Sequence, residues 1–76
     1  MTRRARIITL MKELNLSLIT LREMRDEVEY FLDGVTEHNS EEVVAEAMEE
    51  HAHLLDACSN LARCLEKLAA TTRTEQ

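Results

Sequence analysis

One stretch, residues 7–35, limits what this chain can fold into. When it is counted in sevens, its apolar residues fall into the a and d columns of a heptad repeat. Column a holds Ile7, Leu14, Leu21, Val28 and Val35, and column d holds Leu10, Met24 and Phe31 with Ser17 as an interruption. Because this repeat keeps one face of a helix against a neighbour, the stretch predicts a long helix that needs a partner helix.

A third column, e, widens the apolar stripe of this helix with Met11, Leu18 and Leu32. A three-column stripe is broader than the seam of a two-stranded coiled coil. Ser17 has two interpretations: it sets the register, or it is a small residue that lets a facing helix approach.

Residues 40–70 repeat the pattern. Column a holds Val44, His51, Cys58 and Leu65, column d holds Ala47, Leu54, Leu61 and Leu68, and column e holds Met48, Leu55, Ala62 and Ala69. We therefore expect helices over about 2–33 and about 40–70, a connection over 34–39, and a frayed polar tail over 71–76. Thr2 is the expected first N-cap and Asn39 or Ser40 the second, with Gly34 in a left-handed conformation between them.

The expected fold class is all-α, an antiparallel two-helix hairpin over residues 1–70 with coiled-coil packing. The sequence has no proline, one glycine, and alanine, leucine, methionine, glutamate and arginine in abundance, a composition that favours helix over sheet. A chain of 76 residues buries only ~60% of its unfolded surface. The hairpin is therefore expected to complete a bundle, either by dimerising or by docking onto another protein.

Two stripes this wide cannot be covered by two helices alone, and Ile8, Leu16, Ile19 and Tyr30 lie outside the stripe of the first helix. Exposed apolar patches of this size mark interfaces. The expected interface residues are Ile7, Leu10, Met11, Leu14, Leu16, Leu18, Ile19, Leu21, Met24, Val28, Phe31, Leu54, Leu55, Cys58, Leu61, Leu65 and Leu68.

The net charge of −6 is unevenly placed. Residues 1–25 hold six basic and two acidic residues, whereas residues 26–76 hold three basic and thirteen acidic ones. This asymmetry favours antiparallel or head-to-tail association. The basic end is also able to meet nucleic acid or a membrane surface, although a solvated face is the simpler interpretation.

Neither a signal peptide nor a membrane span is expected, because charged residues interrupt every apolar run before it reaches ~20 residues. Cys58 and Cys64 are six residues apart on one expected helix and are not positioned to bridge. Reduced thiols in a cytoplasmic protein are the simplest account.

One constellation resembles enzyme chemistry. Glu50 and His53 form the Glu-x-x-His pair of di-iron bundles, and a symmetric dimer would bring two copies together, as in encapsulated-ferritin hairpins. Both residues lie off the apolar stripe, so a solvated face is the expected role and a di-iron ferroxidase a remote alternative. His51, at an a position, is expected to be a hydrogen-bonded register residue. We expect no enzyme activity, no cofactor, and no catalytic or metal site.

The layout over Ile7 to Leu68, with the run Leu54-Leu55-Asp56-Ala57-Cys58-Ser59-Asn60-Leu61-Ala62, resembles the small co-chaperones of type III secretion needle subunits. Those are acidic helical hairpins that pair with a larger helical-repeat chaperone and keep the needle protein from polymerising. The resemblance implies a protein-binding adaptor or co-chaperone that shields amphipathic helices of a partner.

A second resemblance is to plasmid copy-number repressors, which form four-helix bundles and bind RNA. It is carried by Glu50-His51-Ala52-His53-Leu54-Leu55, Cys58 and Arg63-Cys64-Leu65. That alternative implies a homodimer whose RNA contacts come from Arg3, Arg6, Lys12, Arg22 and Arg25.

Overall fold

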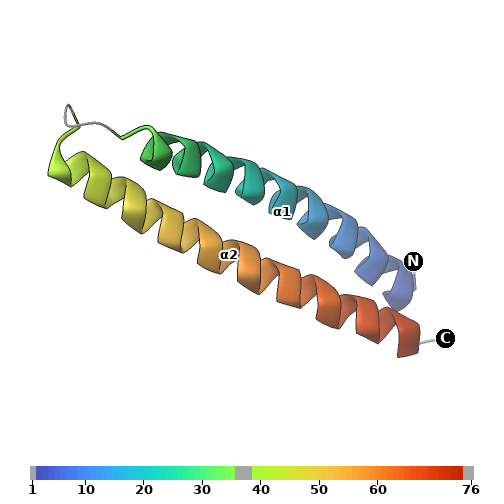
Figure 1. Ribbon diagram of the computed structural model, residues 1–76. Helices are drawn as coiled ribbons and strands as arrows, with labels where there is room; N and C mark the ends of the chain where they lie inside the picture. The colour runs from blue at the N-terminus through green and yellow to red at the C-terminus, as the bar shows by residue number, and fades with distance from the viewer. Residues whose placement is uncertain (1, 36–38, 75–76) are drawn as a thin grey trace.

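The chain folds into a hairpin of two long antiparallel helices, seen in a computed structural model that describes residues 2–35 and 39–74 (Figure 1). Helix α1 spans Arg3–Asp33 and helix α2 spans Glu41–Thr74. They lie side by side along a molecule 58 Å long and about 15 Å across, with both chain ends at one end and the connection at the other. The expected all-α hairpin is confirmed.

The backbone groups at the two ends of α1 find their hydrogen-bond partners in different ways. Thr2 is the N-cap, and its side-chain oxygen accepts a hydrogen bond of 3.1 Å from the backbone N–H of Ala5. At the other end, Gly34 donates its N–H to the carbonyls of Tyr30 and Phe31. Its φ of −96° and ψ of 7° lie outside the left-handed region, so the expectation for Gly34 was wrong. The last turn of α1 therefore ends with a hydrogen bond between residues three apart, and no residue in the left-handed conformation is needed.

Replacing Gly34 with alanine is therefore expected to raise the free energy of unfolding by about 0.4–1 kcal/mol, because alanine restricts the unfolded chain at no cost in the folded one. A Cβ atom there would lie 3.5 Å from the carbonyl oxygen of Tyr30, an ordinary contact. Urea denaturation followed by circular dichroism measures the change. A clear loss of stability in Gly34→Ala would mean that this turn needs glycine.

Helix α2 begins at a conventional cap and runs further than expected. The hydroxyl of Ser40 accepts a hydrogen bond of 3.2 Å from the N–H of Val43, and Glu41 and Glu42 occupy the first turn, where the helix dipole favours carboxylates. At the far end, the expected fray over 71–76 is corrected for residues 71–74, which are helical. The hydroxyls of Thr71, Thr72 and Thr74 donate to backbone carbonyls three or four residues earlier, and residues 75–76 lie outside the described chain.

The two helices use different columns of their heptads for the seam between them. In α2 the buried and half-buried residues follow columns a and d, as expected. In α1 they follow columns a and e, whereas Leu10, Met24 and Phe31 of column d are exposed. Ser17 explains the difference. If column d faced α2, this small polar side chain would lie at the middle of the seam; with column e facing α2, that place is taken by Leu18, the most buried residue of the core.

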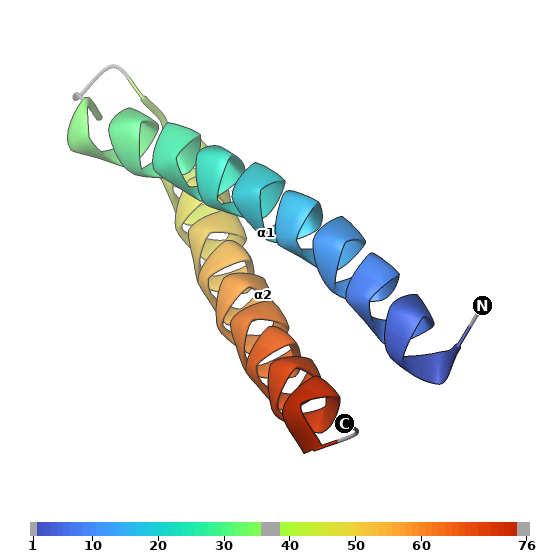
Figure 2. The ribbon, with the colours of Figure 1, turned by 90° about the vertical axis from the view of Figure 1, so that its right-hand side faces the viewer.

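The core is thin. Among the described residues only Leu18, Leu54 and Cys58 are buried, and no residue is fully enclosed. The remaining seam residues are half-buried. Figure 2 shows the ribbons of the two helices crossing near the connection and separating toward the chain ends.

Candidate interaction surfaces

The hairpin itself covers most of the residues expected at a partner interface. Eleven of the seventeen are buried or half-buried along the seam: Ile7, Met11, Leu14, Leu18, Leu21, Val28, Leu54, Cys58, Leu61, Leu65 and Leu68. Six remain exposed: Leu10, Leu16, Ile19, Met24, Phe31 and Leu55. These six, together with exposed apolar residues outside the expected set, are the large apolar side chains that the described chain leaves open to another molecule.

Four exposed apolar residues were not among the interface residues expected from the sequence. Ile8, Tyr30, Val43 and Met48 are large, apolar and exposed, with Tyr30 84% accessible to solvent. Met48 and Ile8 were visible in the sequence as apolar positions beyond the a and d columns. Val43 gave no periodic signal, since it lies at a g position among glutamates.

One surface, which we call the groove face, combines apolar residues of both helices. Near the chain ends, a groove with a volume of about 520 Å³ runs between Ile8 and Met11 of α1 and Leu65 and Ala69 of α2. Ile19 follows Ile8 by eleven residues, which places both on one side of α1. Leu55 and Met48 precede Ala69 at heptad spacing and extend the apolar surface along α2. The groove face is therefore Ile8, Ile19, Met48, Leu55, Ala62 and Ala69.

A second surface, the α1 row, lies on the other side of the seam. It consists of Leu10, Ser17, Met24 and Phe31, spaced by seven residues along α1. Phe31 is roughly 140° around the helix from Ile8 at 100° per residue. It borders a hollow with Glu27 of α1 and with Val43, Glu46 and Glu50 of α2. Three carboxylates thus surround the end of the α1 row that is nearest the connection.

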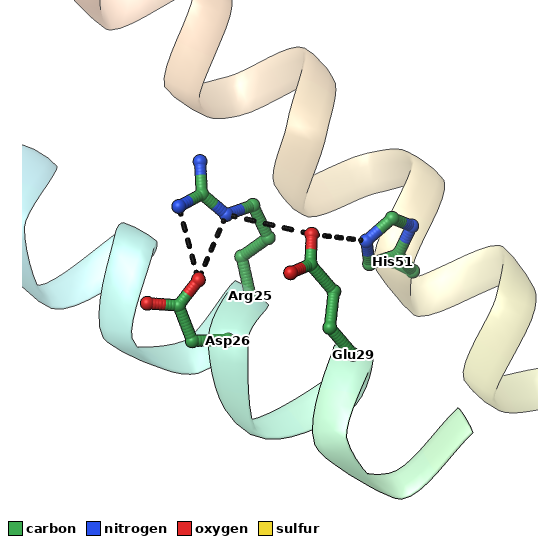
Figure 3. A network of polar contacts seen from close by, with 4 residues as sticks. All are labelled: Arg25, Asp26, Glu29 and His51. Carbon is green, nitrogen blue, oxygen red and sulfur yellow. Dashed lines mark hydrogen bonds and ion pairs between the residues drawn. The ribbon is translucent and has the colours of Figure 1, made fainter. Parts of the chain in front are cut away.

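A polar cluster interrupts the seam in the half nearest the connection (Figure 3). Arg25 occupies the e column of α1, and its guanidinium donates hydrogen bonds of 3.0 and 3.2 Å to one carboxylate oxygen of Asp26. Glu29 lies between Arg25, at 3.8 Å, and the Nε2 atom of His51 on α2, at 3.0 Å. The hydrogen bond to Asp26, with the charges of Asp26 and Glu29, raises the pKa of Arg25 above its usual value.

This cluster is suited to fixing the alignment of the helices. Glu29 bonds to His51 across the seam and accepts at the same oxygen that faces Arg25. A slip of one helix past the other would separate these atoms and leave a half-buried arginine and histidine without their shared carboxylate. His51 is therefore a hydrogen-bonded residue of the seam.

The side chains proposed for chemistry are scattered. Glu50 borders the hollow beside Phe31, whereas His53 is exposed on the outer side of α2, 3.6 Å from Glu49. No group of three or more histidine, cysteine or acidic side chains within residues 2–35 and 39–74 is placed to hold a metal ion. Cys58 and Cys64 are both free thiols, the first buried and the second exposed.

The basic residues do not form one face. Arg3, Arg6 and Lys12 are exposed near the start of α1, but Arg25 turns into the seam, where Asp26 and Glu29 surround its guanidinium. An RNA contact built on all five basic residues would require Arg25 to leave these carboxylates.

Two findings complete the description of the chain. In the part that the structure describes, neither helix is long and apolar enough to cross a membrane. Comparisons with protein-family models, with curated protein sequences and with solved structures give no significant match.

Proposed function

We propose that this chain is a non-enzymatic, protein-binding helical hairpin, an adaptor or co-chaperone that shields an amphipathic helix of another protein. A single observation carries the proposal: three buried core residues stand against ten large apolar side chains that are exposed. Hydrophobic surface in this excess is stabilised when a further helix covers it.

The groove face supports this function best. It takes apolar side chains from both helices, and Ala62 and Ala69 allow a third helix to approach closely along α2. The groove face extends along α2 to Met48, which lies among Glu46, Glu49 and Glu50. Carboxylates at that end favour a partner helix with a basic flank over one with an acidic flank. The proposed occupant is therefore a basic amphipathic helix with an apolar face.

The resemblance to type III secretion co-chaperones narrows the proposal to one class of partner, a needle subunit whose helices would otherwise polymerise. A cytoplasmic location belongs to the same proposal. The RNA-binding alternative is weaker because the guanidinium of Arg25, one of the five basic residues that it requires, is paired with the carboxylates of Asp26 and Glu29.

Fluorescence anisotropy tests the proposal with two labelled synthetic helices that share one apolar face and carry either lysine or glutamate flanks. We expect the lysine-flanked helix to bind, the glutamate-flanked helix to bind more weakly, and Leu55→Asp to weaken binding at least about tenfold, since covering one leucine is worth more than 1.4 kcal/mol. Asn60→Asp, which adds the same charge at an exposed residue of α2 outside the groove face, is the matched control.

Needle subunits and RNA hairpins serve as two further probes in the same assay. Binding of a needle subunit that Leu55→Asp abolishes would support the secretion role. Equal binding of wild type and Leu55→Asp to the basic helix would refute the groove face as the site. RNA binding that weakens steeply with salt, in a chain that ignores both helices, would favour the regulator alternative.

A further inference from the structure

We propose that the α1 row is a self-association surface along which two copies of this chain pair antiparallel, helix α1 against helix α1, with the two-fold axis near Ser17. This surface lies across the seam from the groove face, so the inference goes beyond the proposed function and is tested separately. Its occupant is a second copy of the same chain.

The charge along the hairpin supports an antiparallel pair. The half nearest the chain ends, residues 1–19 and 57–76, holds seven basic and three acidic residues, a net charge of +4. The half nearest the connection, residues 20–56, holds two basic and twelve acidic residues, a net charge of −10. Parallel pairing would place the two strongly acidic halves together, whereas antiparallel pairing places each of them against a basic half.

Helix α1 carries the wrong charges at its ends for a helix on its own. Its first turn contains Arg3, Arg4 and Arg6 without an acidic residue, and its last turn has Asp33 and no basic residue. The helix dipole disfavours both arrangements. In an antiparallel pair, the arginines at the start of one α1 lie beside the acidic end of the other α1. This contact offsets the unfavourable charges at both ends of each helix.

In this arrangement, the hollow at one end of α1 lies opposite the hollow at the other end of α1 in the second copy. A two-fold axis at Ser17 places residue i opposite residue 34 − i of the second copy. The hollow near the start of α1, lined by Arg3, Arg6, Ile7 and Leu10, then faces Phe31, Val28, Glu27 and Met24. Three of those four residues line the acidic hollow beside Val43, Glu46 and Glu50.

The centre of the row is suited to close approach. Ser17 and Thr20 line a shallow hollow between Leu16 and Leu21. Their hydroxyls already donate to the backbone carbonyls of Glu13 and Leu16, each at 3.2 Å. Covering them therefore leaves these donors satisfied. Because Ser17 is one residue from the midpoint of Arg3–Asp33, pairing about it overlaps nearly the whole of α1.

Disulfide trapping tests the orientation in a full-length Cys58→Ala/Cys64→Ala background. Leu10→Cys mixed with Met24→Cys is expected to form a disulfide between copies, because an antiparallel pair brings these positions together. Each variant alone is expected to remain reduced. Leu10→Cys cross-linking to itself, instead of to Met24→Cys, would indicate a parallel pair and overturn the inference.

Charge reversal tests the pairing in solution by analytical ultracentrifugation over a wide range of protein concentrations. We expect a dimer for the wild type, with Arg6→Glu and Glu27→Arg each raising its dissociation constant at least about tenfold, and the double variant Arg6→Glu/Glu27→Arg recovering most of the loss. Both residues are exposed, so circular dichroism is expected to show unchanged helix content. Single reversals without effect, or a double variant no better than either, would refute the register.

Met24→Asp and Leu55→Asp separate this inference from the proposed function. We expect Met24→Asp to abolish the dimer and to keep binding of the lysine-flanked helix, and Leu55→Asp to do the reverse. A wild-type chain that stays monomeric at every concentration overturns the inference alone. A dimer that binds no helix on its groove face overturns the proposed function alone.

Discussion

Leu18→Asp is expected to unfold the hairpin, whereas Leu16→Asp is expected to leave it folded. The two leucines are two residues apart on the same helix, with Leu18 3% exposed and Leu16 66% exposed. At Leu18 the change removes about 1.5–3 kcal/mol of hydrophobic burial and places a carboxylate in the seam without a partner, which costs several kcal/mol more. A small domain is stable by only about 5–15 kcal/mol, and a core of three residues belongs at the lower end.

Circular dichroism at one protein concentration measures this effect through the helix signal and its thermal midpoint. Because Leu16→Asp introduces the same charge into the same helix, it separates burial from the effect of the charge and from helix propensity. A folded Leu18→Asp would mean that column e does not face α2 and that α1 is rotated about its axis. Loss of helix in both variants would instead point to α1 being covered on its outer side.

Arg25→Leu is expected to stabilise the hairpin by about 1 kcal/mol and to raise its melting temperature by about 4–8 °C. Arg25 is the polar member of the seam column that also holds Met11, Leu18 and Leu32, and its side chain is 27% exposed. Leucine would complete that column. Asp26 and Glu29 would lose their arginine contact without becoming unpaired buried charges, because Asp26 is exposed and the half-buried Glu29 keeps its hydrogen bond to His51.

Arg22→Leu is the matched control for this prediction, since it makes the same change one turn earlier at an exposed position and is expected to leave the melting temperature nearly unchanged. NMR spectra report the accompanying cost: without Arg25 the seam has fewer polar contacts to fix its alignment, so Arg25→Leu is expected to show broader or additional signals. A lower melting temperature would show that the guanidinium contributes more than the apolar surface that replaces it.

The sequence was sufficient for the architecture of this chain because heptad spacing, a single glycine and recognisable caps all indicate two paired helices. The residues at which the helices end were harder to predict. The threonines after Ala70 have poor helix propensity, yet their hydroxyls bond to the preceding turn and the helix continues through Thr74. Gly34 ends α1 with a φ that other residues also adopt, and composition alone does not distinguish that turn from a left-handed one.

Which side of α1 faces α2 could not be predicted from the sequence, for a different reason. Columns d and e flank column a on either side, and both are rich in large apolar residues, so periodicity fits a seam along either one. Packing against α2 selects column e through Leu18. The same ambiguity affected the interface: residues that share a stripe in the sequence divide into the seam, the groove face and the α1 row only when the second helix is placed.

The thin core also bears on how long a copy of this chain survives in a cell. A hairpin that buries only Leu18, Leu54 and Cys58 within its described part has little to oppose brief local opening, and opened helices are cut by proteases. Bound molecules deplete the opened state by mass action. We therefore expect the abundance of the chain to follow the supply of whatever covers its apolar surfaces, with unassembled copies degraded first.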